Sequence, residues 1–306
     1  MQATADLDDT TVARSYLAVQ GLGTVVWWMC VFVSDDVRRW TLGGWPHELL
    51  VVPDLVLFAA ASILCAYRWN RVGAIVLSAW TVAITVALIG YALLEREAGW
   101  GALLMVLATI GTVASVATLW HGKLPIDWFF VGPFAFVEAK DATPRRHAAN
   151  SLIQLVVFWT FFLAVLPFTF RWLEHRIRID ASGLDVAWLD GIGAAVFGLA
   201  SGLGLWSCLS MSLRGSGTPL PAATASTLVI AGPYAFVRNP MAVAGACQTI
   251  GVGMWIGAWT PIAAAAVGGV FWHFVIRPAE EADLAARFGA DYIAYRERVG
   301  VWLPRR

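Results

Sequence analysis

Long apolar segments with few charged residues are the feature that most constrains this chain. Six of them have roughly 20 residues, the length at which an α-helix crosses the hydrocarbon core of a bilayer. Within lipid the backbone must satisfy its own hydrogen bonds, which favours helices over open strands. We therefore predict an all-α integral membrane protein. The six predicted spans are residues 16–33, 49–67, 72–94, 98–120, 151–170 and 188–211.

A further apolar segment, residues 241–276, has 36 residues and contains no Asp, Glu, Lys or Arg. It is too long for one span. Thr260 and Pro261 stand near its middle, where Thr favours a helix N-cap and Pro the first helical position. We expect a tight hairpin of two short helices of about 17 residues each, which brings the total to about eight transmembrane helices.

The composition agrees with a membrane protein and excludes other classes. Hydrophobic residues make up 59% of the 306 residues and charged residues only 14%, with a net charge of zero. This balance excludes a disordered chain, and it predicts no nucleic-acid partner. The 17 tryptophans suit the interfacial belts of membrane proteins. The four cysteines lie in apolar segments with no metal-ligand spacing, so we expect no metal site.

The distribution of basic residues predicts the orientation. With eight spans, 15 of the 21 lysines and arginines fall on the side that holds both termini, and 6 fall on the other side. Because cytoplasmic loops carry the excess of positive charge, we place both termini in the cytoplasm. Arginine greatly outnumbers lysine, and Ala and Gly are abundant, a composition typical of a GC-rich bacterial genome. We therefore expect the bacterial cytoplasmic membrane as the location.

The last segment, residues 279–299, differs from the spans because it is charged and amphipathic. Leu284, Phe288, Tyr292 and Tyr295 recur at helical spacing. Gly289 interrupts the pattern. We expect a helix, a turn at the glycine and a second helix, all lying at the cytoplasmic face.

Four motifs in the last third of the chain occur in a recognisable order. They read GTPLP, GPYAFVRNPM, EEADLAARFGADYIAYRERV and LPR. Together they resemble the isoprenylcysteine carboxyl methyltransferase family and its relatives among phospholipid and thiol methyltransferases, which are integral membrane enzymes. The resemblance covers roughly residues 215–306. It divides the chain into residues 1–212, a set of six transmembrane helices, and residues 213–306, a cofactor-binding methyltransferase module.

The resemblance implies S-adenosylmethionine as the cofactor and assigns roles to particular residues. Arg277 is expected near the reacting centre, with Glu281 as the second catalytic residue. Phe288 and Gly289 belong to the segment expected to fold over the site. The cofactor-binding residues implied by the motifs are Gly232, Pro233, Tyr234, Arg238, Asn239, Pro240, Glu280, Tyr292 and Tyr295.

Two positions depart from the family pattern. Asn239 stands where many members have His, and Ala242 stands where Tyr is usual. These departures are expected to change one hydrogen bond to the cofactor and the shape of the substrate entrance.

The resemblance leaves the methyl acceptor open. Methyl transfer from a sulfonium needs mainly positioning and exclusion of water. We expect a membrane lipid or a prenylated small molecule to enter from the bilayer, presenting a carboxylate, an amine or a thiol. Protein partners and oligomeric state stay unassigned.

Two other function classes and two intramembrane residues are also considered. The alternatives are an NADPH-dependent reductase of the sterol-reductase type and a small-molecule transporter.

Asp54, inside the second span, is a functional candidate, because ionisable groups are costly in lipid and therefore rare there without a function. The alternative interpretation is that Asp54 is solvated or paired with an arginine. His273 is interpreted as a packed, hydrogen-bonded histidine in preference to a catalytic base.

Overall fold

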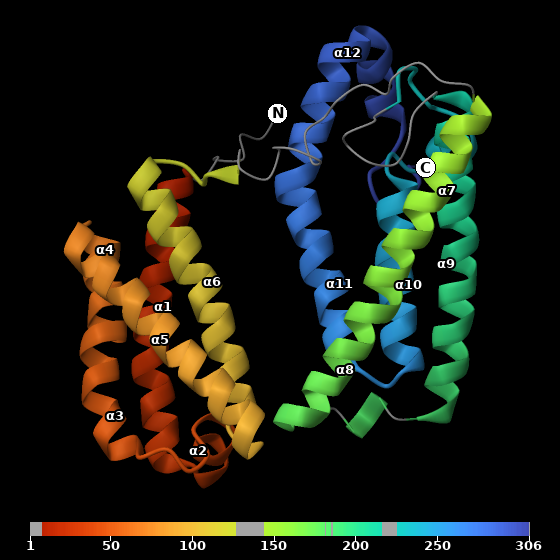
Figure 1. Ribbon diagram of the computed structural model, residues 1–306. Helices are drawn as coiled ribbons and strands as arrows, with labels where there is room; N and C mark the ends of the chain where they lie inside the picture. The colour runs from red at the N-terminus through yellow and green to blue at the C-terminus, as the bar shows by residue number, and fades with distance from the viewer. Residues whose placement is uncertain (1–7, 127–143, 181, 185, 216–224, 306) are drawn as a thin grey trace. The chain divides into compact units, whose positions relative to one another are not determined.

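The computed structural model describes residues 8–126, 144–180, 182–184, 186–215 and 225–305 (Figure 1). Their regular structure is helical, and one isolated parallel bridge joins Val237 to Gly300. The chain forms two compact units. The first unit comprises Met1–Pro125 with His175–Ile179, and the second comprises Ile126–Glu174 with Asp180–Arg306. These compact units do not test the predicted functional boundary at residue 212, which stays a prediction.

The first unit is a bundle of long helices joined by short turns. Its elements are α1 (Asp9–Val33), α2 (Asp35–Thr41), α3 (His47–Asp54), the π-helix η1 (Leu55–Ala60), α4 (Ala61–Tyr67), α5 (Arg71–Glu95) and α6 (Gly99–His121). Helix α1 packs against α4 and α6, and α5 packs against α6. Asn70 caps α5 by accepting a hydrogen bond of 2.9 Å from the Val72 amide.

Polar contacts and a close approach connect the helices of this bundle. The Gln20 side-chain amide on α1 donates to Ser62 on α4 and to Thr112 on α6, each at 3.0 Å. A Cβ atom on Gly111 would lie 2.1 Å from the ring of Tyr16, so α6 needs glycine where α1 crosses it. Small residues and interhelical hydrogen bonds are the usual means of helix association in lipid.

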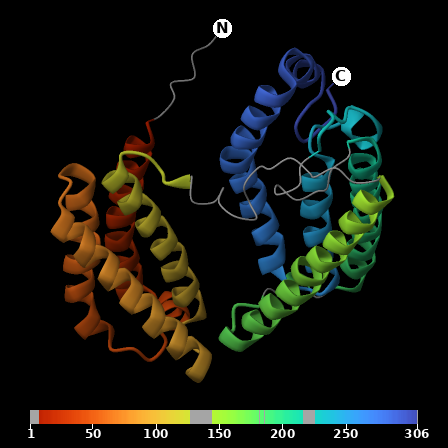
Figure 2. The same cartoon turned by 45° about the horizontal axis from the view of Figure 1, so that its top comes forward.

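The second unit contains the remaining helices, apart from residues 175–177 at the end of α8, which belong to the first unit. They are α7 (Pro144–Trp159), η4 (Thr160–Val165), α8 (Leu166–Ile177), the 3-10 turn η5 (Ser182–Leu184), α9 (Ala187–Arg214), the 3-10 turn η7 (Gly232–Ala235), α10 (Pro240–Trp255), α11 (Trp259–Phe271), the π-helix η8 (Trp272–Ile276) and α12 (Arg277–Arg298). Helices α9 and α10 lie side by side (Figures 1 and 2). A Cβ on Gly193 would lie 2.6 Å from the Gly251 carbonyl oxygen, and the Gln248 side chain donates to Ser201 at 3.0 Å.

The predicted helical hairpin is present, with its turn at residues 256–258. Helix α10 has 16 residues, and α11 continues through η8 into α12. The expected cap differs, because Ala258 is the N-cap of α11 and not Thr260. Instead, both the amide and the hydroxyl of Thr260 donate to the buried Glu174 carboxylate, at 2.7 and 2.5 Å. A side chain from α8 thus satisfies the helix end, which the local sequence could not reveal.

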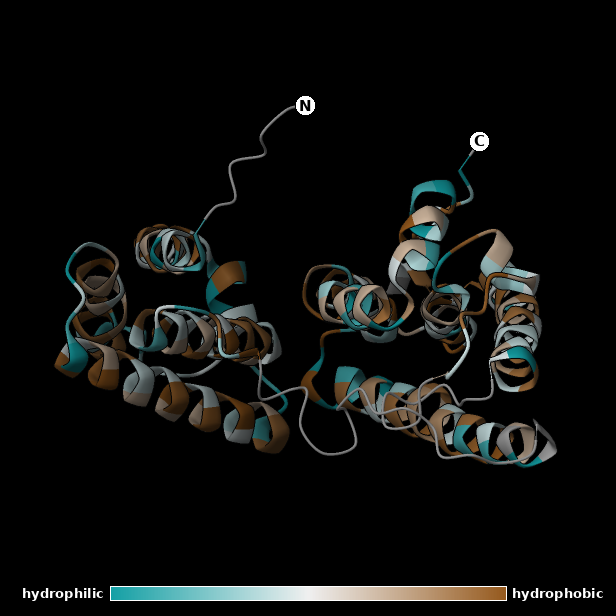
Figure 3. Ribbon diagram, turned by 90° about the horizontal axis from the view of Figure 1, so that it is seen from above, coloured by the Kyte–Doolittle hydropathy of each residue, from teal (hydrophilic) through white to brown (hydrophobic). Residues whose placement is uncertain are grey.

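Seven helices among the described residues are long and apolar enough to cross a membrane, and the shorter α10 is a further apolar helix. They are Asp9–Val33, His47–Tyr67, Arg71–Glu95, Gly99–His121, Ala148–Ile177, Ala187–Arg214 and Trp259–Arg298, whose apolar part ends at Ile276. Many large hydrophobic side chains on these helices are exposed. Hydrophobic residues, coloured brown, recur along the helix ribbons in Figure 3. This pattern suits contact with lipid, and the predicted all-α integral membrane fold is confirmed.

Candidate functional site

The described end of the segment between α9 and α10, residues 225–239, forms the base of the candidate site and is called the loop below. Gly232 begins the η7 turn with φ of +65°, and a Cβ there would lie 2.8 Å from the Ser210 hydroxyl. Both observations require glycine at this position. Pro233 and Tyr234 follow and are buried. The motif predicted from the sequence therefore forms a tight turn packed onto α9.

The C-terminal tail returns to this loop. Gly289 has φ of +53° and ψ of −129°, which divides α12 into two helical segments, as the sequence predicts. Beyond this kink, the buried Tyr295 donates its hydroxyl hydrogen to the Tyr234 carbonyl at 2.7 Å. The Arg238 amide then donates to the Gly300 carbonyl at 2.8 Å. In Figures 1 and 2 the last residues accordingly lie beside the segment that precedes α10.

Asn239 and Pro240 begin α10, as expected of these residue types. The Asn239 side chain accepts a hydrogen bond of 3.0 Å from the Ala242 amide, and Pro240 is the first helical residue. The amide nitrogen of the same side chain lies 3.4 Å from Oε2 of Glu280 on α12. Asn239 thus performs two tasks, capping α10 and contacting an acidic residue of the tail.

Three charged residues meet beside this contact. One carboxylate oxygen of Glu281 lies 2.8 Å from Nη1 of Arg238 and 3.2 Å from Nη1 of Arg277. The side chains of Arg238 and Glu281 are 11% and 16% exposed, so their attraction is weakly screened by solvent. Arg277 is further held by its Nε, which donates to the His273 carbonyl at 3.1 Å. A side-chain hydrogen bond also joins Arg238 to Tyr292.

Several buried polar atoms at the site have no hydrogen-bond partner among the described residues. They are Nε and Nη1 of Arg238 and the hydroxyl of Tyr234; Nη1 lies near Glu281 without hydrogen-bond geometry. Burial raises the pKa of Tyr234 well above its ordinary value, so this hydroxyl remains a neutral donor. Unsatisfied buried donors are costly, and an anionic or polar ligand group would satisfy them.

Glu280 has an unusual acidity. It lies on α12, beyond the apolar segment that ends at Ile276. Burial, reinforced by the neighbouring Glu281 carboxylate, raises the pKa of Glu280 from 4.5 to about 7. The carboxyl group therefore changes its charge near neutral pH, where perturbed acids often mark functional sites.

The structure places the predicted site residues of the loop and the tail in one cluster. Motif GTPLP, residues 217–221, lies outside the described residues. His273 has the predicted packed role, because its Nδ1 accepts a 3.0 Å hydrogen bond from the indole of Trp302. Trp302 and Gly300, which contact the site from the end of the tail, were not predicted from the sequence. The only signal for them was their position within the final motif region.

Comparisons with known proteins support the resemblance. Residues 189–291 match the phospholipid methyltransferase family. This match confirms the predicted likeness to membrane methyltransferases for that third of the chain. A solved structure of the eukaryotic intramembrane Ras methyltransferase, isoprenylcysteine carboxyl methyltransferase, is 19% identical, with 97% of this chain and 98% of that chain covered and a TM-score of 0.32. Among curated proteins, no sequence matches the chain.

Proposed function

We propose that this protein is an integral membrane methyltransferase that uses S-adenosylmethionine to methylate a lipidic or isoprenoid-linked acceptor. The observation that carries the proposal is the return of the tail onto the loop. It brings Arg238, which precedes α10, into contact with Glu281 on α12. The family match over residues 189–291 includes both partners.

The residues present fit the proposed cofactor. Its carboxylate would accept a charge-assisted hydrogen bond from Nε of Arg238, which has no hydrogen-bond partner among the described residues. Its ammonium would pair with Glu280 in the ionised form. Tyr234 offers a neutral hydroxyl beside them. When bound, the cofactor supplies an electrophilic methyl group on a sulfonium.

The protein's own contribution is to position the two reactants and to exclude water from them. Glu281 holds Arg277 and Arg238 through one carboxylate oxygen, so the two cations keep a defined separation. We propose that Arg277 binds the polar end of the acceptor; holding two reactants in place contributes up to roughly 7–11 kcal/mol to such reactions. Tyr292 and Tyr295 are buried, and we propose that their rings cover the cluster and shield it from solvent.

The two reactants would reach the cluster by different routes. Arg277 begins α12 directly after the apolar η8, at the boundary between the apolar and the charged parts of one continuous helix. A water-soluble cofactor would approach from the charged side and a lipid from the apolar side. On the proposed orientation, with both termini in the cytoplasm, the charged side faces the cytoplasm.

Two measurements test the proposal on the full chain in lipid nanodiscs. Isothermal titration should show binding of S-adenosylhomocysteine and none of NADPH, because a reductase would show the reverse. Incubation with methyl-labelled cofactor and a membrane lipid extract should then transfer label to a lipid fraction. Binding of NADPH alone, or no transfer of label to any lipid fraction, would contradict the proposal.

A further inference from the structure

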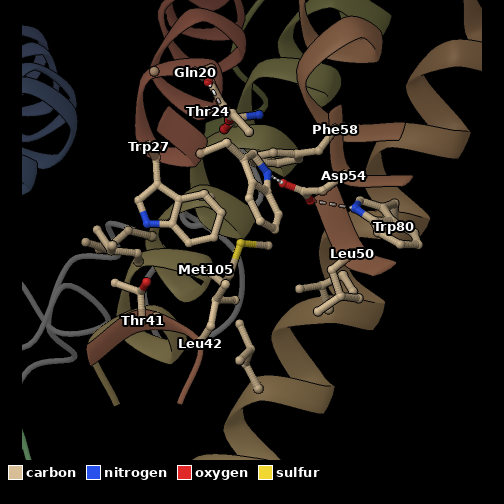
Figure 4. A pocket seen from close by; sticks show the side chains of 18 of the residues that line it. Gln20, Thr24, Trp27, Thr41, Leu42, Leu50, Asp54, Phe58, Trp80 and Met105 are labelled. Atoms are coloured by element: carbon tan, nitrogen blue, oxygen red, sulfur yellow. Dashed lines mark hydrogen bonds between the residues drawn. The ribbon is translucent and has the colours of Figure 1, made fainter. Parts of the chain in front are cut away.

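The first unit contains a cavity that the proposed methyl transfer does not use. Its volume is about 470 Å³, within the usual range for small-ligand sites, and it lies among α1, η1, α5 and α6 (Figure 4). Most of its lining is apolar or aromatic. The aromatic residues that line it include Trp27, Trp28, Trp45, Phe58 and Trp80.

One carboxylate faces this aromatic cavity. Asp54 is 9% exposed, and its two oxygens accept hydrogen bonds from the indoles of Trp28 at 2.8 Å and Trp80 at 2.9 Å (Figure 4). The alternative interpretation of Asp54 is therefore wrong, because this side chain is buried and its hydrogen bonds come from indoles and not from an arginine. The residues described as lining the cavity include no Lys, Arg or His.

The hydrogen bonds to Asp54 come from neutral groups and leave its charge uncompensated. Each carboxylate oxygen has a second lone pair, so the group retains acceptor capacity. The helix is also irregular at this point, since Pro53 precedes Asp54 and the π-helix η1 begins at Leu55. Such π-helical turns occur frequently at functional sites.

We propose that this cavity binds an organic cation, an amine or a quaternary ammonium group carried by an apolar molecule. Asp54 supplies the countercharge, and the surrounding rings attract a cation through their electron-rich faces. An anion would be repelled by Asp54, and a neutral molecule would lack the charge attraction that a cation gains there. The proposal rests on the first unit alone and is independent of the proposed methyl transfer.

Equilibrium dialysis with the full chain in nanodiscs tests this site, with empty nanodiscs correcting for partition into lipid. The probe is hexyltrimethylammonium, compared with its neutral isostere in which carbon replaces nitrogen. The wild-type protein should bind the cation at least roughly tenfold more tightly, because a charge pair in an apolar site is worth more than 1.4 kcal/mol. Equal affinity for both probes would overturn the proposal.

Two variants separate the ligand site from a structural role of Asp54. Asp54→Asn should weaken binding of the cation about tenfold and leave binding of the neutral probe unchanged. If that variant does not fold, Gly23→Phe serves instead, since Gly23 lines the cavity and a Cβ there meets nothing within 4 Å. This variant keeps Asp54 and should abolish binding by filling the space. Full retention of cation binding in a folded variant would contradict the site.

The source of the cation is distinguished by the lipid. In phosphatidylcholine nanodiscs, a site that accepts lipid headgroups should be occupied by choline, and the apparent affinity for hexyltrimethylammonium should fall several-fold relative to phosphatidylglycerol nanodiscs. An affinity that is equal in both lipids identifies the occupant as a free organic cation.

Discussion

The two units differ in how they surround charged side chains near the membrane. In the first unit a single carboxylate, Asp54, is enclosed by helices and held by two neutral indoles. In the second unit, Arg238, Arg277 and Glu281 lie at the end of the apolar helices and pair with one another. A lone buried charge is available to a ligand of opposite sign, whereas a paired cluster is suited to holding side chains in fixed positions.

The largest effect should come from Arg277. Arg277→Ala should lower methyl transfer by roughly 100-fold or more, because it removes the cation proposed to position the acceptor. The chain should still fold, since the Arg277 side chain is 23% exposed and its hydrogen bonds are to His273 and Glu281 within the same continuous helix. Transfer of label from methyl-labelled cofactor measures the loss.

The matched control for this variant is Arg298→Ala on the same helix, where the arginine is exposed and donates only to the Ala294 carbonyl. It should retain full turnover. Retained turnover in the Arg277 variant itself would remove that residue from the site.

A smaller effect is expected at Glu281. Glu281→Gln removes the shared partner of Arg238 and Arg277 and should weaken S-adenosylhomocysteine binding about tenfold, since the two guanidinium groups then repel without a common anion. Calorimetry measures the change. Glu297→Gln, an exposed position on the same helix, is the control and should bind as the wild type does. Unchanged affinity in both variants would show that the paired cluster does not support the cofactor.

Cofactor affinity should also depend on pH through Glu280. Because its pKa is raised to about 7, the carboxyl is protonated below pH 7 and must lose that proton to pair with the cofactor's ammonium. Affinity should therefore rise up to about tenfold per unit as the pH approaches 7 from below, and level off above it. Calorimetry at pH 6 and pH 8 tests this. Glu280→Gln should remove the dependence, and an identical slope in that variant would assign it to another group.

The same group predicts how the stability depends on pH. The folded chain holds the Glu280 proton more tightly than the unfolded chain, whose carboxyl titrates near 4.5. The stabilising contribution is complete below pH 4.5 and is lost as the pH rises through 7.

The smallest effect should come from the contact that anchors the tail. Tyr295→Phe removes one buried hydrogen bond to the Tyr234 carbonyl and should lower the free energy of unfolding by about 1 kcal/mol. Tyr67→Phe is the matched control in the first unit, because its side chain is 79% exposed. Thermal unfolding in nanodiscs compares the two. An equal and negligible effect of both variants would show that the tail is not held by this contact.

Much of the fold could be predicted because it depends on local physical properties. The six spans and the hairpin follow from apolar length, and the kink at Gly289 from the residue that tolerates positive φ. The start of α10 follows from Asn239 and Pro240. These features are set by a residue and its near neighbours in the chain.

The candidate site was predictable in its members but not in its contacts. The motifs indicated Arg238 and Glu281, yet the sequence could not show that the Glu281 oxygen that pairs with Arg277 on the same helix also pairs with Arg238. Nor could it show that Glu174 satisfies the start of α11, where Thr260 was expected to cap the helix. In each case the partner that the sequence could not reveal, Arg238 before α10 or Glu174 on α8, comes from a segment remote in the chain.

The sequence by itself therefore determined that this is a helical membrane protein whose last third carries a methyltransferase motif. Tertiary structure alone decided that the tail packs on the loop before α10, and that Asp54 faces an aromatic cavity between Trp28 and Trp80. The physical reason is distance along the chain. Hydropathy and backbone preference act within a few residues, whereas a buried polar group finds its partners only once remote segments have packed together.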